Sequence, residues 1–240
     1  MRAVIKPSVA VFGASGSIGQ AICSHFVAEG WKVLALSRKD QPLSETVLGA
    51  HWLAWDREPA LATREVLSAS PIQAVVWAQG RNCTDSIHSF DEDVHVQMYE
   101  ANVLFVLRTL DMLLRLQALA RPARLCVVSS IWQDIARPNK LSYCVSKAAL
   151  RGLVQSVALD LGGEGHLINA VLPGALDTPM THANLTETQL RQLADMTPLK
   201  RLATLRDVCA AVLCLCSPNN TSVTGQFIAV DGGFSHAKML

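Results

Sequence analysis

The stretch that decides the fold is VAVFGASGSIG, residues 9–19. It starts with an apolar run of strand character, passes through a glycine-rich turn, and enters a segment of helical period from Ser17 to Glu29. Such a turn needs backbone angles that glycine adopts at little cost, and it lets the main chain approach a pyrophosphate closely. The helix that follows presents unpaired N–H groups and the positive end of its dipole to that anion. The stretch therefore predicts a dinucleotide site whose residues are Gly13, Ser15, Ser17, Ile18 and Gly19.

The rest of the chain continues the alternation of apolar strands and longer helical segments. Further strands are expected at 32–36, 51–55, 72–78, 125–129, 166–172 and 226–230, and further helices at 59–68, 92–119, 142–161 and 207–216. Strands that are apolar throughout are typical of a parallel sheet buried on both faces. The sequence therefore predicts an α/β fold, a doubly wound Rossmann-like parallel sheet of about seven strands with helices on both faces. Residues 1–240 form a single domain in this interpretation, with a polar lid at about 178–200.

The composition narrows the class of protein. Of the 240 residues, 50% are hydrophobic and 17% are charged, and the formal net charge is +1. These values exclude a disordered chain and a nucleic-acid binder that relies on bulk positive charge. No apolar stretch reaches the roughly 18 residues of a membrane span, and the segment before the first strand is too short for a signal peptide. We therefore expect neither a nucleic-acid nor a membrane partner.

The cysteines and histidines bear on location and on metals. The seven cysteines include no Cys-x-x-Cys pair, and several lie in apolar runs. We interpret them as reduced thiols that act as small core residues, which predicts a cytoplasmic protein. The seven histidines show no metal-ligand spacing, so no metal site is expected.

The residues after the second strand bear on the type of dinucleotide. A carboxylate there would accept hydrogen bonds from the adenosine ribose and repel a 2′-phosphate. The chain has Ser37-Arg38-Lys39 instead. Arginine forms charge-assisted bonds to a phosphate, and serine leaves room for one. We therefore expect NADP(H) as the preferred cofactor and NAD(H) as the alternative; solvated loop charges at Arg38 and Lys39 are the other interpretation. Asp56, after the third strand, is a candidate for binding the adenine amino group or for capping a turn.

A tyrosine and a lysine lie one helical turn apart in the segment 142–161. Tyr143 and Lys147 share a face of that helix because they are four residues apart. An ammonium beside a phenol favours the phenolate and lowers its pKa, which suits a general acid/base for an alcohol and ketone pair. Ser130 ends the preceding strand at the edge of the sheet where ligands bind, so its hydroxyl is placed to orient a substrate oxygen.

These residues occur together with other motifs at regular intervals along the chain. The further motifs are Asn102, Pro173-Gly174 and Val230-Asp-Gly-Gly233. With the glycine turn and with Ser130, Tyr143 and Lys147, they make the chain resemble the short-chain dehydrogenase/reductase family from residue 9 to 234, in its compact single-domain branch. The last third is similar to 3-oxoacyl-acyl-carrier-protein reductases.

The resemblance implies a role for each matching residue. Tyr143 would be the catalytic acid/base, Lys147 would lower its pKa and hold the nicotinamide ribose, and Ser130 would bind the substrate oxygen. Asn102 would hold a water that relays protons from Lys147. The cofactor-binding residues that the resemblance adds are Gly80, Lys147, Pro173, Gly174 and Thr178.

The chain departs from the family pattern in two places. Gly16 precedes Ser17, so the glycine spacing matches that of the extended branch, whose members need about a hundred more residues for a substrate domain. The length and the Val230-Asp-Gly-Gly233 end lead us to expect the compact branch. Trp77-Ala-Gln-Gly80 replaces the usual Asn-Asn-Ala-Gly after the fourth strand, and only Gly80 is kept. We expect Trp77 to fill the space of the missing polar groups, the alternative being a reshaped cofactor pocket.

The expected substrate is a small secondary alcohol or ketone, with a polar sugar- or cyclitol-like compound as one candidate. Trp132 and His182 are candidate substrate contacts, because one follows Ser130 and the other lies in the lid. Reduction of 3-oxoacyl groups on acyl carrier protein is the alternative. Relatives with that activity dock the acidic carrier on two arginines; here Arg121 lies near one position and Glu164 near the other, and a carboxylate would repel the carrier. A catalytically idle nucleotide-binding module is the alternative from another class.

The family also implies self-association. A homotetramer or homodimer is expected, built through the two long helices and the last strand. The arginines at 108, 115, 121, 124 and 137 are interpreted as a solvated face.

Overall fold

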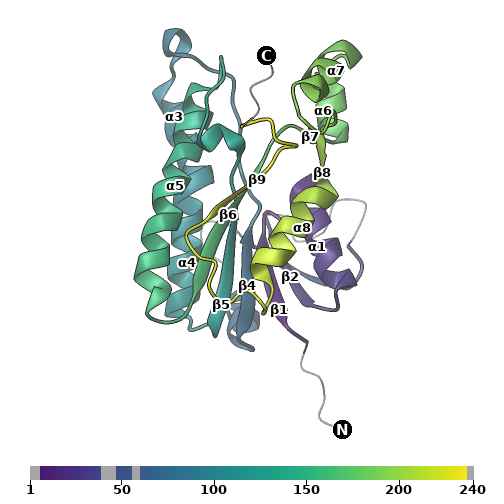
Figure 1. Ribbon diagram of the computed structural model, residues 1–240. Coiled ribbons are helices and arrows are strands. Elements are labelled where there is room, and N and C mark those ends of the chain that lie inside the picture. The colour runs from purple at the N-terminus through teal and green to yellow at the C-terminus, as the bar shows by residue number, and fades with distance from the viewer. Residues whose placement is uncertain (1–5, 39–46, 56–59, 237–240) are drawn as a thin grey trace.

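The computed structural model describes residues 6–38, 47–55 and 60–236. Seven strands of this part of the chain pair in parallel as one sheet, in the order β3-β2-β1-β4-β5-β6-β9 (Figure 1). The strands are β1 (Ser8–Phe12), β2 (Lys32–Ser37), β3 (Ala50–Ala54), β4 (Ile72–Trp77), β5 (Leu119–Val128), β6 (Leu167–Pro173) and β9 (Phe227–Val230). The predicted fold class is therefore confirmed.

Alternate residues of the strands enter two separate cores, because successive side chains of a strand point to opposite faces. In β1, Val9 and Val11 pack with one set of helices, while Ala10 and Phe12 pack with the other. The first core lies under α1 (Ser17–Ala28) and α8 (Leu205–Cys216), and the second lies under α2 (Leu61–Ser68), α4 (Phe105–Arg115) and α5 (Leu141–Gly162). Figure 1 shows α1 and α8 on one side of the sheet and α4 and α5 on the other.

The prediction of one helix over 92–119 is wrong in its extent. The structure has α3 (Glu92–Tyr99), a π-helical segment η2 (Glu100–Leu104) and α4, which ends at Arg115. Gln117 takes a positive φ of 50° after α4, and β5 then begins at Leu119, well before the strand expected at 125–129. Leu119 pairs with Ile72, and the register shifts before the next pair, where the polar Arg124 interrupts the apolar pattern. That interruption hid the first half of the strand.

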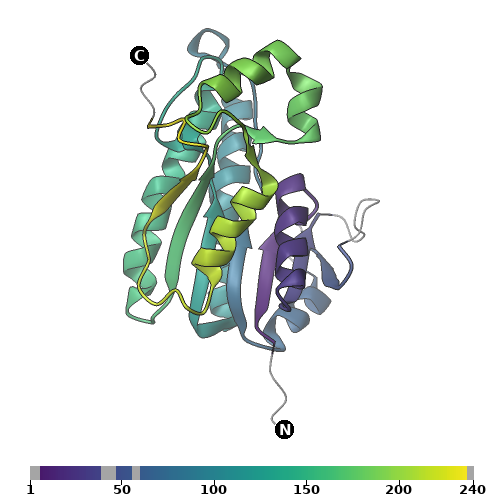
Figure 2. The same ribbon diagram turned by 45° about the vertical axis from the view of Figure 1, so that its right-hand side comes forward.

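The predicted lid contains two short helices, α6 (Pro179–Asn184) and α7 (Glu187–Asp195). They lie above the carboxyl end of the sheet (Figure 2). A small parallel ribbon of β7 (Leu176–Asp177) and β8 (Ala203–Thr204) joins the two ends of this segment. Single 3-10 turns complete the described chain at η1 (Ile87–Ser89) and η3 (Ile131–Gln133).

All seven cysteines of the chain are free thiols. Within the described ranges, no helix combines the length and the apolar character that crossing a membrane requires.

Candidate active site

The turn after β1 needs glycine at two positions. Gly13 has a φ of 76°, and a Cβ on it would lie 2.5 Å from the backbone nitrogen of Gln79. A Cβ on Gly19 would lie 2.2 Å from the carbonyl oxygen of Gly13. Gly16 is the N-cap of α1, and no side chain of the described residues caps this helix. The first N–H groups of α1 therefore remain available to an anion.

A groove of about 820 Å³ opens beside this turn. Gly13, Ser37 and Gly80 line it from the carboxyl ends of β1, β2 and β4. The chain runs outward from β1 to β2 and returns to β4 on the other side, so the groove lies at the topological switch point, where sheets of this type bind ligands.

The predicted cofactor residues are placed unequally around the groove. Ser15, Gly16 and Arg38 line it together with Gly13, whereas Ser17, Ile18 and Gly19 form the first turn of α1 beside it. Asp56 and Lys39 lie outside the described residues.

Where the sequence after β4 departs from the family pattern, the indole of Trp77 fills the space. Trp77 is fully buried, its Nε1 donates to Thr109 Oγ1 at 2.7 Å, and its ring stacks on Phe12 with centroids 6.0 Å apart. Space filling by Trp77 is therefore what the structure shows, and Trp77 itself does not line the groove. Two residues later, Gln79 lines the groove, and its buried Oε1 has no hydrogen-bond donor among the described residues.

Asn102 lies in the π-helical segment η2 and is buried. Its side chain bonds the backbone of Arg81 in both directions, with Oδ1 accepting at 2.7 Å and Nδ2 donating at 3.1 Å. Nδ2 also donates to Ser146 Oγ at 2.8 Å. Asn102 therefore ties the segment after β4 to helix α5. A π-helical turn within an α-helix often marks a functional site.

Lys147 is also buried. Its Nζ donates to the carbonyl oxygen of Val128 at 3.3 Å, and burial lowers its pKa to about 8. A Cβ on Gly80 would lie 3.3 Å from Asn102 Oδ1 and 3.7 Å from Lys147 Nζ. The glycine kept from the family pattern therefore leaves room beside both of these polar groups.

Tyr143 lies one turn before Lys147 on α5, and Lys147 Nζ is 5.7 Å from the centroid of its ring. The lowering of the Tyr143 pKa expected from the sequence is not seen. Burial raises this pKa above its ordinary value, and hydrogen bonding with Ser130 offsets only part of the effect. Lys147 does not offset this rise, because burial lowers its own pKa to about 8 and its Nζ lies over the Tyr143 ring, 5.7 Å from the centroid.

Ser130 follows β5 and caps η3, where its Oγ accepts from the backbone nitrogen of Trp132 at 3.3 Å. The same hydroxyl interacts with Tyr143. The structure thus brings Ser130, Tyr143, Lys147 and Asn102 into one cluster at the carboxyl edge of the sheet.

Sequence reasoning missed the group that holds the start of α5. The buried carboxylate of Asp85 accepts from the backbone nitrogen of Ser142 with both oxygens, each at 3.2 Å. Ser142 Oγ is 2.8 Å from His95 Nδ1. Burial raises the pKa of Asp85, but the hydrogen bonds from Ser142 and Cys83 outweigh it and the net pKa is lowered. No periodicity or motif marks Asp85, because it lies in an irregular segment far from α5 in the sequence.

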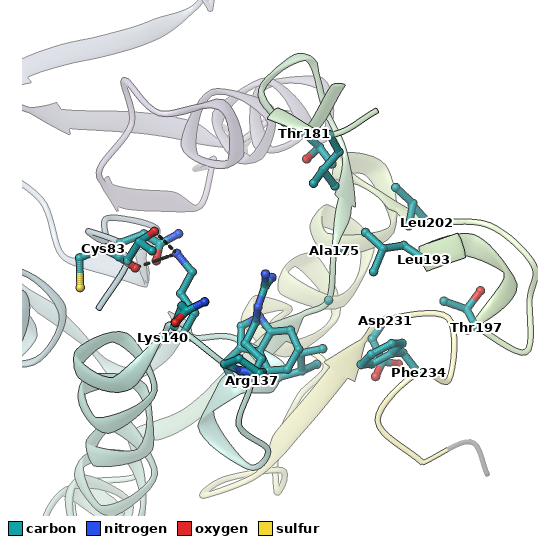
Figure 3. Close-up of a pocket in the computed structure, with 18 residues that line it drawn as sticks. Cys83, Arg137, Lys140, Ala175, Thr181, Leu193, Thr197, Leu202, Asp231 and Phe234 are labelled. Atoms are coloured by element: carbon teal, nitrogen blue, oxygen red, sulfur yellow. Dashed lines mark hydrogen bonds between the residues drawn. The ribbon is translucent and has the colours of Figure 1, made fainter. Parts of the chain in front are cut away.

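A second pocket, of about 680 Å³, lies between the lid and the segment that precedes α5 (Figure 3). Trp132 and Gly174 line it, as the sequence predicts for residues near the substrate and the nicotinamide. A Cβ on Gly174 would lie 2.7 Å from that of Asp231, which explains glycine at this position. Pro173 ends β6 directly before it.

Two other predicted residues have structural partners. Thr178 is the N-cap of α6, and its Oγ1 accepts from the backbone nitrogen of Thr181 at 3.3 Å. His182 Nε2 lies 2.6 Å from Asp177 Oδ1 in an exposed pair. From this helix, Thr181 rather than His182 lines the pocket.

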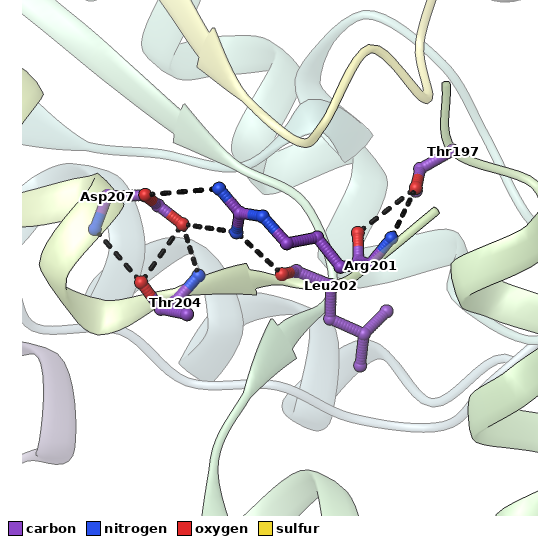
Figure 4. A network of polar contacts seen from close by, with 5 residues as sticks. All are labelled: Thr197, Arg201, Leu202, Thr204 and Asp207. Carbon is purple, nitrogen blue, oxygen red and sulfur yellow. Dashed lines mark hydrogen bonds and ion pairs between the residues drawn. The ribbon is translucent and has the colours of Figure 1, made fainter. Parts of the chain in front are cut away.

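The lid is anchored where it returns to the sheet (Figure 4). Asp207 accepts from Arg201 Nη1 and from the backbone nitrogen of Thr204, both at 2.8 Å. Arg201 contributes most to holding the pKa of this carboxyl well below its usual range. Thr197 Oγ1 donates to the carbonyl oxygen of Arg201 at 3.0 Å, which fixes the lid end against the same turn.

The groove fits a dinucleotide on its own geometry. Gly13 and Gly19 admit no side chain. Among the described residues, no side chain caps the first turn of α1, and no donor reaches the buried Oε1 of Gln79. Each feature matches a pyrophosphate or a ribose hydroxyl in the groove.

Comparisons with known proteins agree with this geometry. The profile of the family described as enoyl-(acyl carrier protein) reductase matches residues 62–235. The 2-(R)-hydroxypropyl-CoM dehydrogenase of Xanthobacter autotrophicus is 28% identical over 243 residues, which cover 94% of this chain and 97% of the relative. The L-xylulose reductase of Caenorhabditis elegans is 29% identical over 240 residues, 95% of each chain. The ligand-free structure of Thermoplasma acidophilum aldohexose dehydrogenase matches with a TM-score of 0.84 at 26% identity, over 98% of this chain and 96% of that one.

Proposed function

Because the chain belongs to the short-chain dehydrogenase/reductase family, we propose that it transfers a hydride between NADP(H) and a secondary alcohol or ketone. The observation that carries the proposal is that Ser130 bonds Tyr143, that Lys147 Nζ lies over the Tyr143 ring, and that Lys147 and Asn102 lie beside Gly80, which lines the groove. The nicotinamide group, when bound, supplies or accepts the hydride. The residues of this chain bind the cofactor, orient the substrate and transfer the proton.

Tyr143 is the proposed acid/base. Its raised pKa keeps the phenol protonated at neutral pH, so it can donate a proton to a carbonyl oxygen. Ser130, which interacts with the same hydroxyl, orients that oxygen. Lys147 holds the ribose side of the cofactor, and Asn102 supports the proton path from it by fixing the segment at Gly80.

The preference for NADP(H) rests on the end of β2. Ser37 and Arg38 line the groove, and no carboxylate stands in this position to repel a 2′-phosphate. A comparison of KM values for NADPH and NADH tests the preference, and a lower KM for NADH would contradict it.

The decisive experiment replaces the two tyrosines of the chain separately. Tyr143→Phe should lower kcat at least ~100-fold on any carbonyl that the protein reduces, because general acid catalysis contributes about that much. NADPH should still raise its melting temperature. Tyr99→Phe, the matched control, removes the only other tyrosine hydroxyl and should leave kcat within about twofold, as expected of a change that touches no reacting group. Full activity of Tyr143→Phe would refute the proposed role.

The proposed substrate is a small polar alcohol or ketone, with sugar- or cyclitol-like compounds as candidates. The names of the xylulose reductase and the aldohexose dehydrogenase support this class. The alternative, reduction of a group on an acyl carrier protein, is weakened by an ion pair of 3.0 Å between Arg121 and Glu164, because that carboxylate would repel an acidic carrier. Stabilisation by NADPH without turnover on a broad carbonyl panel would instead favour an idle nucleotide-binding module.

We further propose that the protein self-associates in the cytoplasm. Leu107 on α4, Val145 and Leu159 on α5, and Ile228 on β9 are large apolar side chains left exposed along the expected interface. They support a homodimer or homotetramer, which light scattering during size-exclusion chromatography would test. The free thiols support a cytoplasmic location.

A further inference from the structure

The pocket under the lid has one apolar and one cationic wall. Leu185, Leu193 and Leu202 line it from the lid side. Arg137 and Lys140, from the segment between Ser130 and Tyr143, line it from the other side. Figure 3 shows Arg137 between Lys140 on one side and Leu193 and Leu202 on the other.

The ammonium of Lys140 is already hydrogen-bonded to neighbouring groups of the protein. Its Nζ donates to Asn82 Oδ1 at 2.9 Å, to the carbonyl oxygen of Cys83 at 2.7 Å and to Thr84 Oγ1 at 3.4 Å. These bonds use all three of its protons, so Lys140 contributes positive charge to the pocket but no free donor. Burial lowers its pKa, and repulsion by the nearby Arg137 adds to this.

Asp231 is the one acidic side chain among the described residues that line the pocket, and its oxygens already accept hydrogen bonds from the protein. Its carboxylate accepts from the backbone nitrogens of Gly233 and Ser235, both at 2.8 Å, and from Ser235 Oγ at 2.6 Å. These donors hold the carboxylate oxygens away from the cationic wall, and among the described lining residues the two cations Arg137 and Lys140 outnumber this one carboxylate.

Arg137 is the cation with free donors. Its guanidinium carbon lies 5.6 Å from the centroid of the Trp132 ring, a cation–π contact that supports the planar group. No hydrogen-bond acceptor or carboxylate of the described chain contacts this guanidinium. A supported guanidinium with unused N–H groups is suited to bind an oxyanion with two parallel bonds.

We propose that the substrate carries an oxyanion substituent, such as a carboxylate, sulfonate or phosphate, and that Arg137 binds this group. The inference rests on the proposed function and deepens it. The anionic end of the substrate faces the segment 137–140, and its carbon skeleton lies against the leucines of the lid. The reacting carbonyl then points toward Ser130 and Tyr143, which flank this segment in the chain.

The test uses pairs of small ketones that differ only in charge, each offered as the free acid and as its methyl ester. Steady-state kinetics with NADPH are measured for the wild type, Arg137→Gln and Arg137→Lys. The matched control is Arg115→Gln, which removes an equal charge from an exposed arginine on α4 that pairs with Asp111. Sulfonate and phosphonate analogues of the best acid show which oxyanion is preferred.

We expect the wild type to prefer the acids over their esters. Arg137→Gln should lower kcat/KM for the acids roughly ten- to hundredfold, mainly through KM, as loss of a charged hydrogen bond predicts, and leave the esters unchanged. Arg137→Lys should recover part of the loss, and Arg115→Gln should behave as the wild type. Equal use of acids and esters by the wild type, or equal losses for both in Arg137→Gln, would overturn the inference.

A binding measurement separates this inference from the proposed reaction. If no ketone is turned over, the reaction fails, and calorimetric titration of the NADPH-loaded protein with the same pairs decides the anion site. Tighter binding of acid than ester that is lost in Arg137→Gln supports it; equal binding, or no binding of either, rejects it.

Discussion

The buried ammonium of Lys147 lowers the stability of the folded protein. Its ammonium is buried with one backbone acceptor, the carbonyl oxygen of Val128 at 3.3 Å, so the charged form is poorly compensated. Burial accordingly lowers the pKa of Lys147 to about 8. A group that destabilises the protein in which it stands is typical of a site kept for binding or chemistry.

Replacing Lys147 by methionine should therefore stabilise the protein without cofactor while abolishing turnover. The free energy of unfolding at pH 7 should rise by on the order of 3 kcal/mol, the value that the difference between 10.5 and about 8 implies. Loss of the Val128 bond and imperfect packing of methionine reduce the gain. Denaturant titration at pH 7 measures it.

The pH dependence identifies the cause of that gain. Between about pH 8 and pH 10.5 the unfolded chain holds the Lys147 proton and the folded chain does not, so the stability of the wild type rises with pH in this window. Lys147→Met lacks this rise, so its advantage should shrink steadily as the pH is raised from 8 to 9.5. Parallel stability curves for the two proteins would contradict the assignment.

At the level of single residues, the sequence predicted best where chemistry demands a fixed spacing. Tyr143 and Lys147 are neighbours because four residues make one helical turn, and Gly13 could be identified because its turn admits no side chain. The shift of the Tyr143 pKa was predicted in the wrong direction, since burial, which a sequence does not reveal, dominates it. Arg137 looked like surface charge because its cation–π partner and the lid leucines meet only in three dimensions.

Helix α5 is the element on which the site depends, and its first turn is fixed from outside. Asp85 holds the backbone nitrogen of Ser142, and an isolated parallel bridge joins Asp85 to Lys140. This start determines where Tyr143 lies. The sequence located α5 almost to the residue, but it could not show what fixes the beginning of the helix, because Asp85 lies in a segment without regular structure.

The Asp85→Ala variant tests whether Asp85 both stabilises the fold and positions Tyr143. Loss of a buried acceptor at a helix start should lower the free energy of unfolding by about 1–2 kcal/mol, and kcat should fall several-fold because Tyr143 is less well placed. Asp85→Asn, which keeps one oxygen acceptor, should recover most of both. Asp111→Ala on the exposed side of α4 is the control. An unchanged kcat in a folded Asp85→Ala protein would show that α5 needs no such anchor.

Boundaries within elements were harder to predict than the elements themselves. The segment 92–119 has one helical pattern in sequence, yet it holds α3, a π-helical segment and α4. A π-helical segment is defined by its backbone hydrogen bonds, which the pattern of apolar residues does not reveal.

At the scale of the whole molecule, the sheet divides the interior into two cores with different chemistry. The core under α1 and α8 contains Cys23, Cys126, Cys209 and Cys216, all buried. Burial raises the pKa of Cys23 and Cys209 to about 12, so neither forms a thiolate near neutral pH. By contrast, Cys214 is exposed.

Alkylation should follow this division. In the native protein at pH 8, iodoacetamide should modify Cys214 first, and the four buried thiols should react only after unfolding in guanidinium chloride. Peptide mass spectrometry after timed quenching gives the rate for each cysteine. Comparable rates for Cys214 and Cys23 in native buffer would mean that the core beneath α1 and α8 opens readily.

The ribbon of β7 and β8 gives the lid an unusual independence. Leu176 and Ala203 are register partners, so the chain leaves the body of the protein and returns to it at one place. The helices α6 and α7 between these two points add no strand to the seven-stranded sheet, so we expect changes in them to leave it intact. The end of the segment is held separately, because Leu199 donates to the carbonyl oxygen of Gly232 after β9. The residues of the lid that contact a substrate can change in this way while the proposed proton-transfer residues Tyr143 and Lys147, which belong to α5, stay in place.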